Sequence, residues 1–320
     1  MRVLVTGGAG FIGSHLVEKL VLKEHEVIVI DDLSNGHIDY LNPIIHNNNL
    51  TFIKGSILET ELLESIVPNV DVVYHLASVL GVKNTVENPL KVIDGNINGT
   101  RKILQLANDH QVKVVFASTS EIYGKNTQLP FKEDSDRVLG PPQTHRWCYA
   151  TAKALNEHIC YAYAKQGLTV TVVRYFNTFG PRQTASQYGG VIPKFITAAL
   201  TNQPITVYGD GSQTRSFLFV KDTVEATYRC MYLEGKSETM NIGSTETLSI
   251  MELAQKIKAF TQSNSEIVCI PYEKVYEDGF EETKNRLPDI SKAKDIFGFS
   301  PVTSFDKGLL ETIGWYKSRL

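Results

Sequence analysis

A tyrosine and a lysine stand four positions apart, at Tyr149 and Lys153, within a stretch of helical pattern. This spacing places a phenol and an ammonium on the same face of a helix. A nearby ammonium stabilises the phenolate, which allows a tyrosine to exchange protons near neutral pH. Because such pairs also occur by chance on protein surfaces, the interpretation depends on the residues that accompany the pair.

Hydroxyl and carboxyl side chains accompany it, in a run that starts at Ser118 after a strand-like segment, Lys113–Ala117. The strand ends of a doubly wound sheet face the ligand crevice. The sequence therefore predicts a proton-transfer site whose candidate catalytic residues are Thr119, Ser120, Glu121, Tyr149 and Lys153. For Glu121 there is an alternative role, that of a buried carboxylate that only positions Tyr123 or a loop.

A glycine-rich segment near the N-terminus has the spacing GxxGxxG, at Gly7, Gly10 and Gly13. It lies between a strand-like run, Arg2–Thr6, and a helical pattern, Phe11–Leu22, which is the context of a dinucleotide-binding turn. Glycines there permit a tight turn and a close approach of the backbone to pyrophosphate. The helix N-terminus adds free amide groups and the positive end of a dipole. The segment therefore predicts a dinucleotide site.

An aspartate, Asp31, ends the second strand-like run, about 20 residues after the glycines, where dinucleotide-binding folds carry an acid. Its carboxylate would accept hydrogen bonds from the adenosine ribose and repel a 2′-phosphate, which favours NAD over NADP as the cofactor. The neighbouring Asp32 either assists or is a solvated turn residue.

Strand and helix patterns alternate in the first half of the chain and supply the frame for these residues. Such alternation predicts an α/β fold, a doubly wound parallel Rossmann sheet with helices on both faces. The predicted strands are Arg2–Thr6, Glu26–Ile30, Leu50–Lys54, Asp71–Tyr74, Lys113–Ala117 and Thr169–Arg174, and the predicted helices include Phe11–Leu22, Pro89–His110 and Tyr149–Gln166.

The pattern changes after Gly180, where helices and short strands mix, with turn signals at 208–211 and 241–243. We expect a smaller mixed α/β substrate-binding lobe there, with the ligand cleft between the two parts. The expected division is an NAD-binding Rossmann domain with the catalytic residues over 1–180, and a substrate lobe mainly over 181–320. Some strands and helices of the second part are expected to return to the Rossmann part.

The composition excludes several classes of protein. The chain has 320 residues, a net charge of -3, 42% hydrophobic and 21% charged residues, which is typical of a globular protein. No basic block favours nucleic acid, no apolar run approaches the about 18 residues of a membrane span, and no signal-peptide core follows the N-terminus. The histidines lack ligand spacing, so no metal is expected. Four scattered cysteines fit reduced thiols in the cytoplasm: Cys148, Cys160, Cys230 and Cys269.

In this order, the glycine turn, the hydroxyl run and the YxxxK pair resemble the extended short-chain dehydrogenase/reductases that modify nucleotide sugars, the NAD-dependent epimerase/dehydratase family. The resemblance covers essentially the whole chain. It implies bound NAD, a UDP-sugar substrate by default, and a homodimer formed through the Pro89–His110 and Tyr149 helices. Further matching segments are His75-Leu-Ala, Asn96-x-x-Gly99-Thr100, Arg174-Tyr-Phe-Asn177, Gln213-Thr-Arg215 and Arg286-Leu-Pro-Asp289.

The resemblance also implies roles for individual residues. Thr119 would assist Tyr149, and Lys153 would also hold the nicotinamide ribose. The implied cofactor-binding set is Gly7, Gly10, Phe11, Ile12, Gly13, Asp31, Asp32, Asn35, Gly36, Ser56, Ile57, Leu76, Ala77, Ser78, Asn96, Tyr149, Lys153 and Tyr175. The implied substrate-binding set is Ser118, Thr119, Asn177, Gly190, Val191, Lys194, Thr206, Tyr208, Arg215, Arg286 and Asp289.

Members of this family share a first step, in which the tyrosine takes the proton of the sugar 4-hydroxyl and hydride leaves C4. A 4,6-dehydratase then needs an Asp-Glu pair after the threonine. Here the pair is Ser120-Glu121, and serine is a poor general acid. A UDP-sugar 4-epimerase needs no acid there and stays open as the alternative, on UDP-glucose, UDP-N-acetylglucosamine or UDP-glucuronate. A non-catalytic NAD-binding protein is disfavoured because Thr119, Tyr149 and Lys153 are all present.

Two segments are most similar to UDP-hexuronate decarboxylases of the UDP-xylose synthase type. They are Thr119-Ser-Glu-Ile-Tyr-Gly and Arg146-Trp-Cys-Tyr149, and Gln213-Thr-Arg215-Ser-Phe agrees with them. We therefore expect an NAD-dependent UDP-hexuronate decarboxylase that works through a 4-keto intermediate with internal hydride return. Ser120 and Glu121 would orient the sugar and the departing carboxylate. Arg215 would either neutralise that carboxylate or bind phosphate.

Three positions depart from the pattern of the family. UDP-xylose synthases usually carry arginine near Gly190, so a smaller residue there leaves room for a C2 N-acetyl group. UDP-N-acetylglucosaminuronate is therefore as good a candidate substrate as UDP-glucuronate. Ser56 stands where an aspartate usually meets adenine, which weakens one expected contact. Leu80 stands where galactose-type 4-epimerases carry lysine.

Overall fold

The computed structural model of the chain describes residues 1–79, 88–184, 190–235, 237–271 and 283–320. Its centre is a seven-stranded sheet in the order β11-β6-β5-β4-β1-β2-β3, and every neighbouring pair is parallel. The predicted doubly wound Rossmann sheet is confirmed, with its switch of strand order between β1 and β4. The strands are β1 (Arg2–Thr6), β2 (Glu26–Asp31), β3 (Leu50–Lys54), β4 (Val72–His75), β5 (Lys113–Thr119), β6 (Val170–Tyr175) and β11 (Glu238–Ile242).

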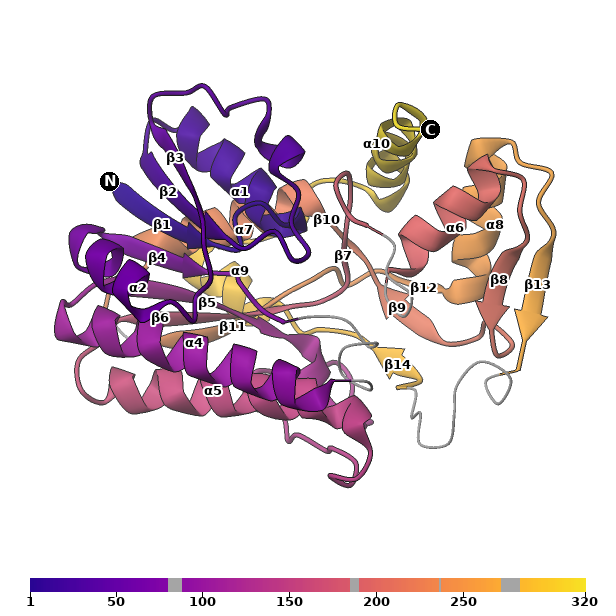
Figure 1. Cartoon of the computed structure of the whole chain (residues 1–320). Coiled ribbons are helices and arrows are strands. Elements are labelled where there is room, and N and C mark those ends of the chain that lie inside the picture. The colour runs from indigo at the N-terminus through magenta and orange to yellow at the C-terminus, as the bar shows by residue number, and fades with distance from the viewer. Residues whose placement is uncertain (80–87, 185–189, 236, 272–282) are drawn as a thin grey trace.

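Helices cover both faces of this sheet (Figure 1). Strand residues are apolar on both sides because each face meets a helix layer. On β1, Val3 and Val5 belong to one hydrophobic core and Leu4 to another, as the alternation of side chains along a strand requires. One layer contains α1 (Phe11–Leu22) and α7 (Val220–Arg229), and the other contains α2 (Thr60–Ile66), α4 (Pro89–Asp109) and α5 (Cys148–Ala164).

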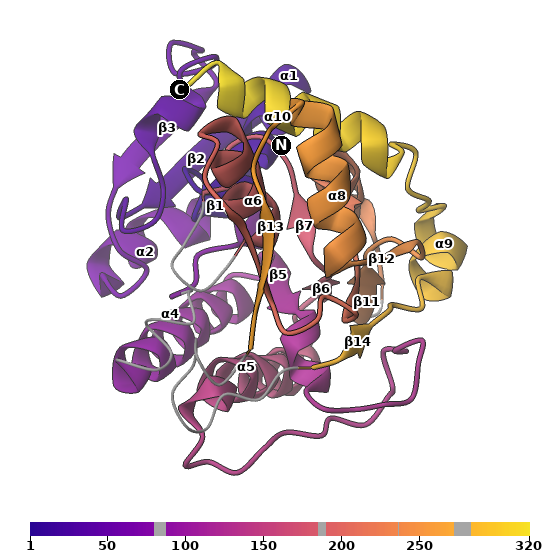
Figure 2. The same cartoon turned by 90° about the vertical axis from the view of Figure 1, so that its right-hand side faces the viewer.

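A smaller mixed lobe lies to one side of the sheet, at the right of Figure 1 and nearest the viewer in Figure 2. Its parallel pair joins β8 (Ile205–Tyr208) to β13 (Ile267–Ile270). A three-stranded sheet places β9 (Thr214–Ser216) between β12 (Thr247–Ser249) and β14 (Asn285–Arg286), and β7 (Thr178–Phe179) pairs with β10 (Leu218–Phe219). The remaining helices are α6 (Val191–Leu200), α8 (Ile250–Thr261), α9 (Ser291–Phe297) and α10 (Phe305–Lys317).

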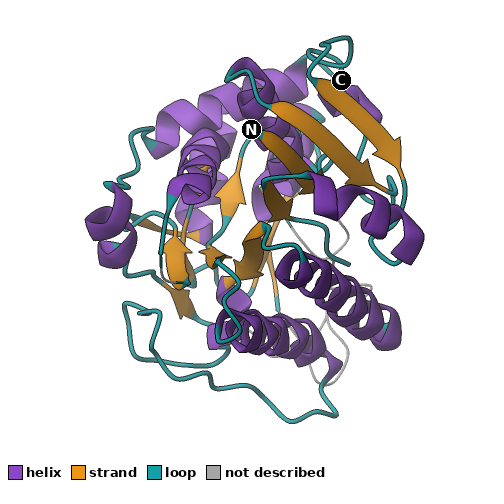
Figure 3. Cartoon of the chain, turned by 90° about the vertical axis from the view of Figure 1, so that its left-hand side faces the viewer, coloured by secondary structure: helices purple, strands orange, loops and turns teal. Residues whose placement is uncertain are grey.

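Short 3-10 helices and one long loop complete the fold. The loop at 124–144 contains no helix or strand and runs along the lower edge of the molecule in Figure 3. An isolated β-bridge joins Phe131 of this loop to Pro288, shortly after β14. The 3-10 helices are η1 (Ile38–Leu41), η2 (Val67–Asn69), η3 (Ser120–Tyr123), η4 (His145–Trp147) and η5 (Cys230–Tyr232).

Several boundaries differ from the predictions. Strand β5 continues through Thr119, so the hydroxyl run is divided between a strand end and the η3 turn. Helix α5 begins at Cys148 and ends at Ala164, before Gln166. The turn expected at 241–243 is wrong, because Asn241 lies inside β11. Buried hydrogen bonds of the Asn241 side chain satisfy this residue within the strand.

No helix among the described ranges is long and apolar enough to cross a bilayer.

Candidate active site

The glycine turn between β1 and α1 is shaped by close backbone contacts. Gly7 has a left-handed backbone, with φ of 72°. A Cβ added at Gly7 would lie 2.7 Å from the Ala77 nitrogen, and one at Gly13 would lie 2.1 Å from the Gly7 oxygen. Glycine is therefore required at both positions. Gly10 is the N-cap of α1 and has no side chain to cap it, so the first-turn amides can hold an anion.

A pocket of about 280 Å³ lies over this turn. Its walls come from the glycine turn, the end of β2, the loop after β3 and the segment after β4. The pocket brings together most of the predicted cofactor residues: Gly7, Gly10, Asp31, Asp32, Asn35, Gly36, Ser56, Ile57, Leu76, Ala77 and Ser78. The turn, the uncapped helix end and a carboxylate at one pocket fit a dinucleotide.

Asp31 fastens the glycine turn to the end of β2. Its Oδ2 accepts a hydrogen bond from the Ala9 amide at 2.9 Å, and its Oδ1 accepts one from the Leu33 amide at 2.9 Å. Burial raises the pKa of this carboxyl group. Each oxygen has a second lone pair, so both can still accept from ribose hydroxyls. Asp32 instead accepts from the Ser34 amide at 2.9 Å in an exposed turn.

Three of the predicted cofactor residues, Ser78, Asn96 and Tyr175, are hydrogen-bonded to other side chains. The Ser78 hydroxyl donates to Asn96 Oδ1 at 2.6 Å, and Asn96 Nδ2 donates to the Val92 carbonyl at 2.7 Å within α4. The Tyr175 hydroxyl is hydrogen-bonded with that of Thr227 on α7 at 2.9 Å, and its ring packs against the hydrophobic core. Tyr175 therefore does not line the pocket over the glycine turn.

Ser56 stands where the family usually carries an aspartate that meets adenine, and its hydrogen bonds are to nearby residues of its own loop. Its hydroxyl accepts from the Leu58 amide at 3.2 Å, and its own amide donates to Glu59 Oε1 at 2.6 Å. The expected Leu80 difference lies outside the described residues.

Tyr149 lies near the end of β5, on the first turn of α5. Its hydroxyl is hydrogen-bonded with the side chains of Ser78 and Thr119. Burial raises the pKa of Tyr149, and the negative charge of Glu121 raises it further, whereas the two hydrogen bonds lower it. The structure thus brings Tyr149, Thr119 and the pocket residue Ser78 together.

Lys153 lies one turn further along α5 and is buried. Its Nζ donates to the Ala117 carbonyl of β5 at 2.9 Å and lies 4.7 Å from the centre of the Phe116 ring. Burial lowers the pKa of this ammonium to about 8. The effect expected of this ammonium on the Tyr149 phenol stays a prediction.

Glu121 lies between two arginines. Arg146 Nη2 donates to its Oε2 at 2.6 Å, and Arg286 Nη1 donates to its Oε1. Burial alone would raise the pKa of Glu121, but the guanidinium groups of Arg286 and Arg146 hold it well below its ordinary range. Glu121 is therefore a carboxylate at neutral pH and is unable to donate a proton.

Arg146 was not among the predicted site residues, although it stands in the Arg146-Trp-Cys-Tyr149 segment. Its guanidinium lies 5.3 Å from the centre of the Trp147 ring. Its Nε is buried and has no hydrogen-bond partner within the described part of the chain. A buried donor of this kind fits an oxygen acceptor from a ligand.

The predicted substrate residues come from the smaller lobe and its junction with the sheet. Arg286 on β14 is the register partner of Arg215 on β9, and both side chains are buried. Arg215 Nη1 donates to the Thr214 and Lys284 carbonyls at 2.8 and 3.0 Å. Asn177 Nδ2 donates to the Ser216 carbonyl at 3.1 Å. These contacts place two guanidinium groups on neighbouring strands.

The other predicted substrate residues are more dispersed. Thr206 and Tyr208 lie on β8, and Val191 and Lys194 lie on α6. Gly190 is the left-handed N-cap of α6, with φ of 74°. That conformation favours glycine over a larger residue.

Asp289 and Ser118 have structural partners. The Asp289 carboxylate accepts from the Ser291 amide at 2.8 Å, where α9 begins. The Ser118 hydroxyl donates to Glu157 at 2.5 Å. Glu157 in turn forms a buried ion pair with Arg174, at 2.7 Å between Nη2 and Oε2.

Within the described ranges, no group of three or more His, Cys, Asp and Glu side chains is placed to hold a metal. A larger groove of about 1020 Å³ lies between α1, α7 and α10 and is lined by none of the predicted site residues. Several of its charged side chains form ion pairs with one another, among them Arg182–Glu18 and Lys19–Glu225.

Comparisons with known proteins agree with this geometry. The model of the "NAD dependent epimerase/dehydratase family" matches residues 3–243. A Bacillus cytotoxicus protein named UDP-N-acetyl-alpha-D-glucosaminuronate decarboxylase is 49% identical over 99% of this chain and 98% of its own length. UDP-glucuronic acid decarboxylase 1 of Danio rerio is 38% identical over 100% of this chain and 73% of its own.

A solved structure has the same fold with ligands bound. It is UDP-glucuronic acid 4-epimerase from Bacillus cereus in complex with UDP-glucuronic acid and NAD, with a TM-score of 0.89 and 28% identity over 100% of both chains. The dinucleotide pocket, the Tyr149 site and these relatives agree, and the chain belongs to the NAD dependent epimerase/dehydratase family.

Proposed function

We propose that this chain is an NAD-dependent decarboxylase of a UDP-hexuronic acid. The observation that carries the proposal is a carboxylate, Glu121, held between Arg146 and Arg286 beside Tyr149. The names of the Bacillus cytotoxicus and Danio rerio relatives support the same reaction.

Tyr149 starts the reaction by removing the proton of the sugar 4-hydroxyl. Its hydrogen bonds with Thr119 and Ser78 fix the phenol oxygen and favour the phenolate. Bound NAD⁺ would supply the hydride acceptor for C4 of the sugar and the hydride that is returned to it. The residues that would hold it are those of the pocket over the glycine turn, with Lys153 proposed at the nicotinamide ribose.

The charges around Glu121 suit the loss of CO₂. The guanidinium groups of Arg286 and Arg146 keep Glu121 in its anionic form. In the 4-keto sugar, the C5–C6 bond breaks, CO₂ leaves, and its electron pair moves onto the C4 carbonyl as an enolate. A proton then adds at C5, from a group other than Glu121, since Glu121 carries none. The anionic Glu121 favours departure of the substrate carboxylate as neutral CO₂.

The smaller lobe supplies the proposed nucleotide site, mainly within residues 181–320. Arg215 and Arg286 lie on neighbouring strands, and arginine forks suit the oxygens of a diphosphate. Glycine at position 190, where UDP-xylose synthases usually carry arginine, and the name of the Bacillus cytotoxicus relative support UDP-N-acetylglucosaminuronate beside UDP-glucuronate as the substrate.

We also propose a homodimer that forms through α4 and α5. These helices pack side by side on one face of the sheet (Figure 1). They expose apolar side chains, with Leu90 72% and Leu155 43% exposed.

The four free thiols support the prediction of a reducing compartment, the cytoplasm.

Mass spectrometry of the products tests the proposed reaction. The purified protein is incubated separately with UDP-glucuronate and UDP-N-acetylglucosaminuronate, first without and then with added NAD⁺. We expect a product lighter by one CO₂, and comparison of kcat/KM identifies the preferred sugar. A strong preference for UDP-glucuronate would contradict the role given to Gly190.

The same experiment separates the alternative, a UDP-sugar 4-epimerase, which the likeness to the Bacillus cereus 4-epimerase supports. A product of unchanged mass and altered retention would establish epimerisation. No change of either uronate would refute decarboxylation and direct the assay to neutral UDP-hexoses.

The pH profile should report Lys153. Burial lowers the pKa of its ammonium to about 8, so the group is charged below that pH and neutral above it. If the charged form holds the ribose, kcat/KM falls as the pH rises through about 8. Lys153→Arg keeps its charge across this range, so the falling limb should disappear from its residual activity. An unchanged limb in this variant would assign it to another group.

A further inference from the structure

A buried hydrogen-bond chain starts in the turn that carries Glu121. Tyr123 lies in the same 3-10 turn, Ser120–Tyr123, and its side chain is fully buried. Its hydroxyl donates to Asn241 Oδ1 at 2.7 Å and accepts from Arg174 Nη1 at 2.8 Å. Burial raises the pKa of Tyr123 to about 12, so the hydroxyl keeps its proton at neutral pH. The turn is thereby tied to β11, at the edge of the sheet.

Asn241 continues the chain toward Arg286. Its Nδ2 donates to the carbonyls of Phe131 and Asp289, at 2.9 and 3.2 Å. The Phe131 backbone also bonds with the segment after Arg286: its amide donates to the Leu287 carbonyl and its carbonyl accepts from the Asp289 amide, both at 2.8 Å. The rings of Tyr123 and Phe131 are stacked, with centroids 4.7 Å apart. Asn241 therefore holds residues 287–289 through Asp289 and Phe131, and Tyr123 supports them through its stacking on Phe131.

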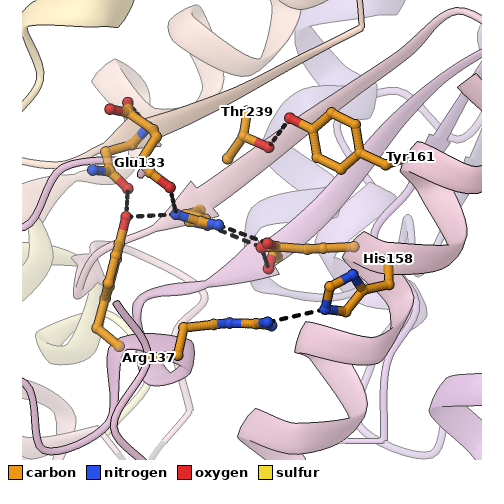
Figure 4. Close-up of polar contacts among 10 residues, drawn as sticks. Glu133, Arg137, His158, Tyr161 and Thr239 are labelled. Atoms are coloured by element: carbon orange, nitrogen blue, oxygen red, sulfur yellow. Dashed lines mark hydrogen bonds and ion pairs between the residues drawn. The ribbon is translucent and has the colours of Figure 1, made fainter. Parts of the chain in front are cut away.

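The chain closes on itself at the ion pair of Arg286 with Glu121. Starting from Glu121, the connections pass through its own turn to Tyr123, then to Asn241, to residues 287–289 and back through Arg286. On the other side of Tyr123, Arg174 holds Glu157, which accepts from Ser118 at the end of β5. Glu133, labelled in Figure 4, adds a further contact, since its Oε1 accepts from the Asn241 amide at 2.8 Å.

We propose that Tyr123 and Asn241 are positioning residues, which hold Glu121 and Arg286 at the separation that decarboxylation requires. This inference rests on the proposed function. The ion pair joins residues far apart in the sequence, and its carboxylate is 22% exposed, so alone it would adopt several geometries. A fully satisfied buried network restricts it to one. Within the described residues, neither side chain is hydrogen-bonded to Tyr149 or Thr119, so we expect a change in either to slow CO₂ release more than oxidation at C4.

Tyr123→Phe tests the proposal because it removes only the hydroxyl. We expect kcat for CO₂ release to fall about tenfold or more, since small misplacements of reacting groups carry penalties of this size. KM for the UDP-uronate should change little. The 4-keto sugar should accumulate with an equal amount of NADH, because C4 oxidation continues while the next step is slowed. Product analysis by mass spectrometry and absorbance of NADH give the two readouts.

Tyr161→Phe is the matched control. The Tyr161 hydroxyl is hydrogen-bonded with Thr239, on the same strand as Asn241, at 2.7 Å (Figure 4). This variant also loses one tyrosine hydroxyl bonded to β11, without touching the chain to Arg286. Its kcat and its level of 4-keto sugar should equal those of the wild type.

Asn241→Asp and a double variant keep the proposal falsifiable if Tyr123→Phe is unstable. Asn241→Asp retains the acceptor for Tyr123 but loses the donor to Phe131 and Asp289, and should give the same accumulation. In the background of Glu121→Gln, Tyr123→Phe should cause no further fall in CO₂ release, because the pair it positions is already broken. Thermal unfolding of each variant measures its folding separately.

The outcomes distinguish this inference from the proposed function. If the wild type releases no CO₂, the proposed function fails. If the wild type releases CO₂ and Tyr123→Phe matches it without accumulating 4-keto sugar, the positioning role is refuted. An equal slowing of C4 oxidation and CO₂ release would also refute it, since that pattern indicates general disruption.

Discussion

Tyr149→Phe is expected to lower turnover by about 10³-fold or more, because it removes the group that takes the proton from the sugar 4-hydroxyl. The Tyr149 hydroxyl is hydrogen-bonded with Thr119 and Ser78, and phenylalanine keeps the ring and its packing. The variant should therefore bind NAD⁺ and the UDP-sugar with nearly unchanged affinity. Single-turnover assays should show neither NADH nor a lighter product.

Tyr161→Phe is the appropriate control, since it removes a hydroxyl from the same helix, α5, and should keep full turnover. Affinity for NAD⁺ can be followed by the quenching of tryptophan fluorescence. Normal turnover of Tyr149→Phe would refute the proposed mechanism, whereas loss of NAD⁺ affinity would show that the hydroxyl acts mainly in binding.

Glu121→Gln should separate the two chemical steps. Gln keeps the size of the side chain but removes the charge that faces Arg146 and Arg286. CO₂ release should fall by about 10²-fold, the size of a lost electrostatic contact at a reacting group. Oxidation at C4 should continue, so the 4-keto sugar accumulates.

The pH dependence of the same variant has a defined sign. The Glu121 carboxylate raises the pKa of Tyr149, so its removal should shift the rise of C4 oxidation toward lower pH.

The stability of the folded protein should also depend on pH through Glu121. Because the pKa of folded Glu121 lies below its ordinary value of 4.5, the ion pair stabilises the wild type above that pH and is lost as the pH falls below it. Thermal unfolding of Glu121→Gln should lack this part of the acid dependence. A wild-type rate of CO₂ release in the variant would exclude Glu121 from the reaction.

Local patterns in the sequence were sufficient to predict the sheet and the dinucleotide turn. The bounds of β1, β3 and α1 match the predicted ranges, because each follows from a short run of apolar residues next to a glycine. The position of Asp31 at the end of β2 was predicted by the same local rule.

Contacts between distant segments were not predictable in this way. The partner of Glu121 on β14 lies 165 residues away, and no local pattern links the two. The spacing of Lys153 from Tyr149 does not predict the hydrogen bond of its ammonium to the Ala117 carbonyl, because that contact depends on the neighbouring strand β5. Asparagine is a residue type that favours turns, but Asn241 lies within β11, where its side chain is hydrogen-bonded to the buried Tyr123 hydroxyl and the Phe131 carbonyl.

The place of β11 in the main sheet has a consequence for how the molecule assembles during synthesis. This strand pairs with β6, but several elements of the smaller lobe, among them α6, β8 and β9, separate the two strands along the chain. Until residues 238–242 have been synthesised, β6 is an edge strand with unpaired backbone groups, which can associate with other chains. Tyr123 also lacks Asn241 until then. A chain that stops near residue 180 should therefore aggregate, and chaperones should bind the nascent protein during that interval.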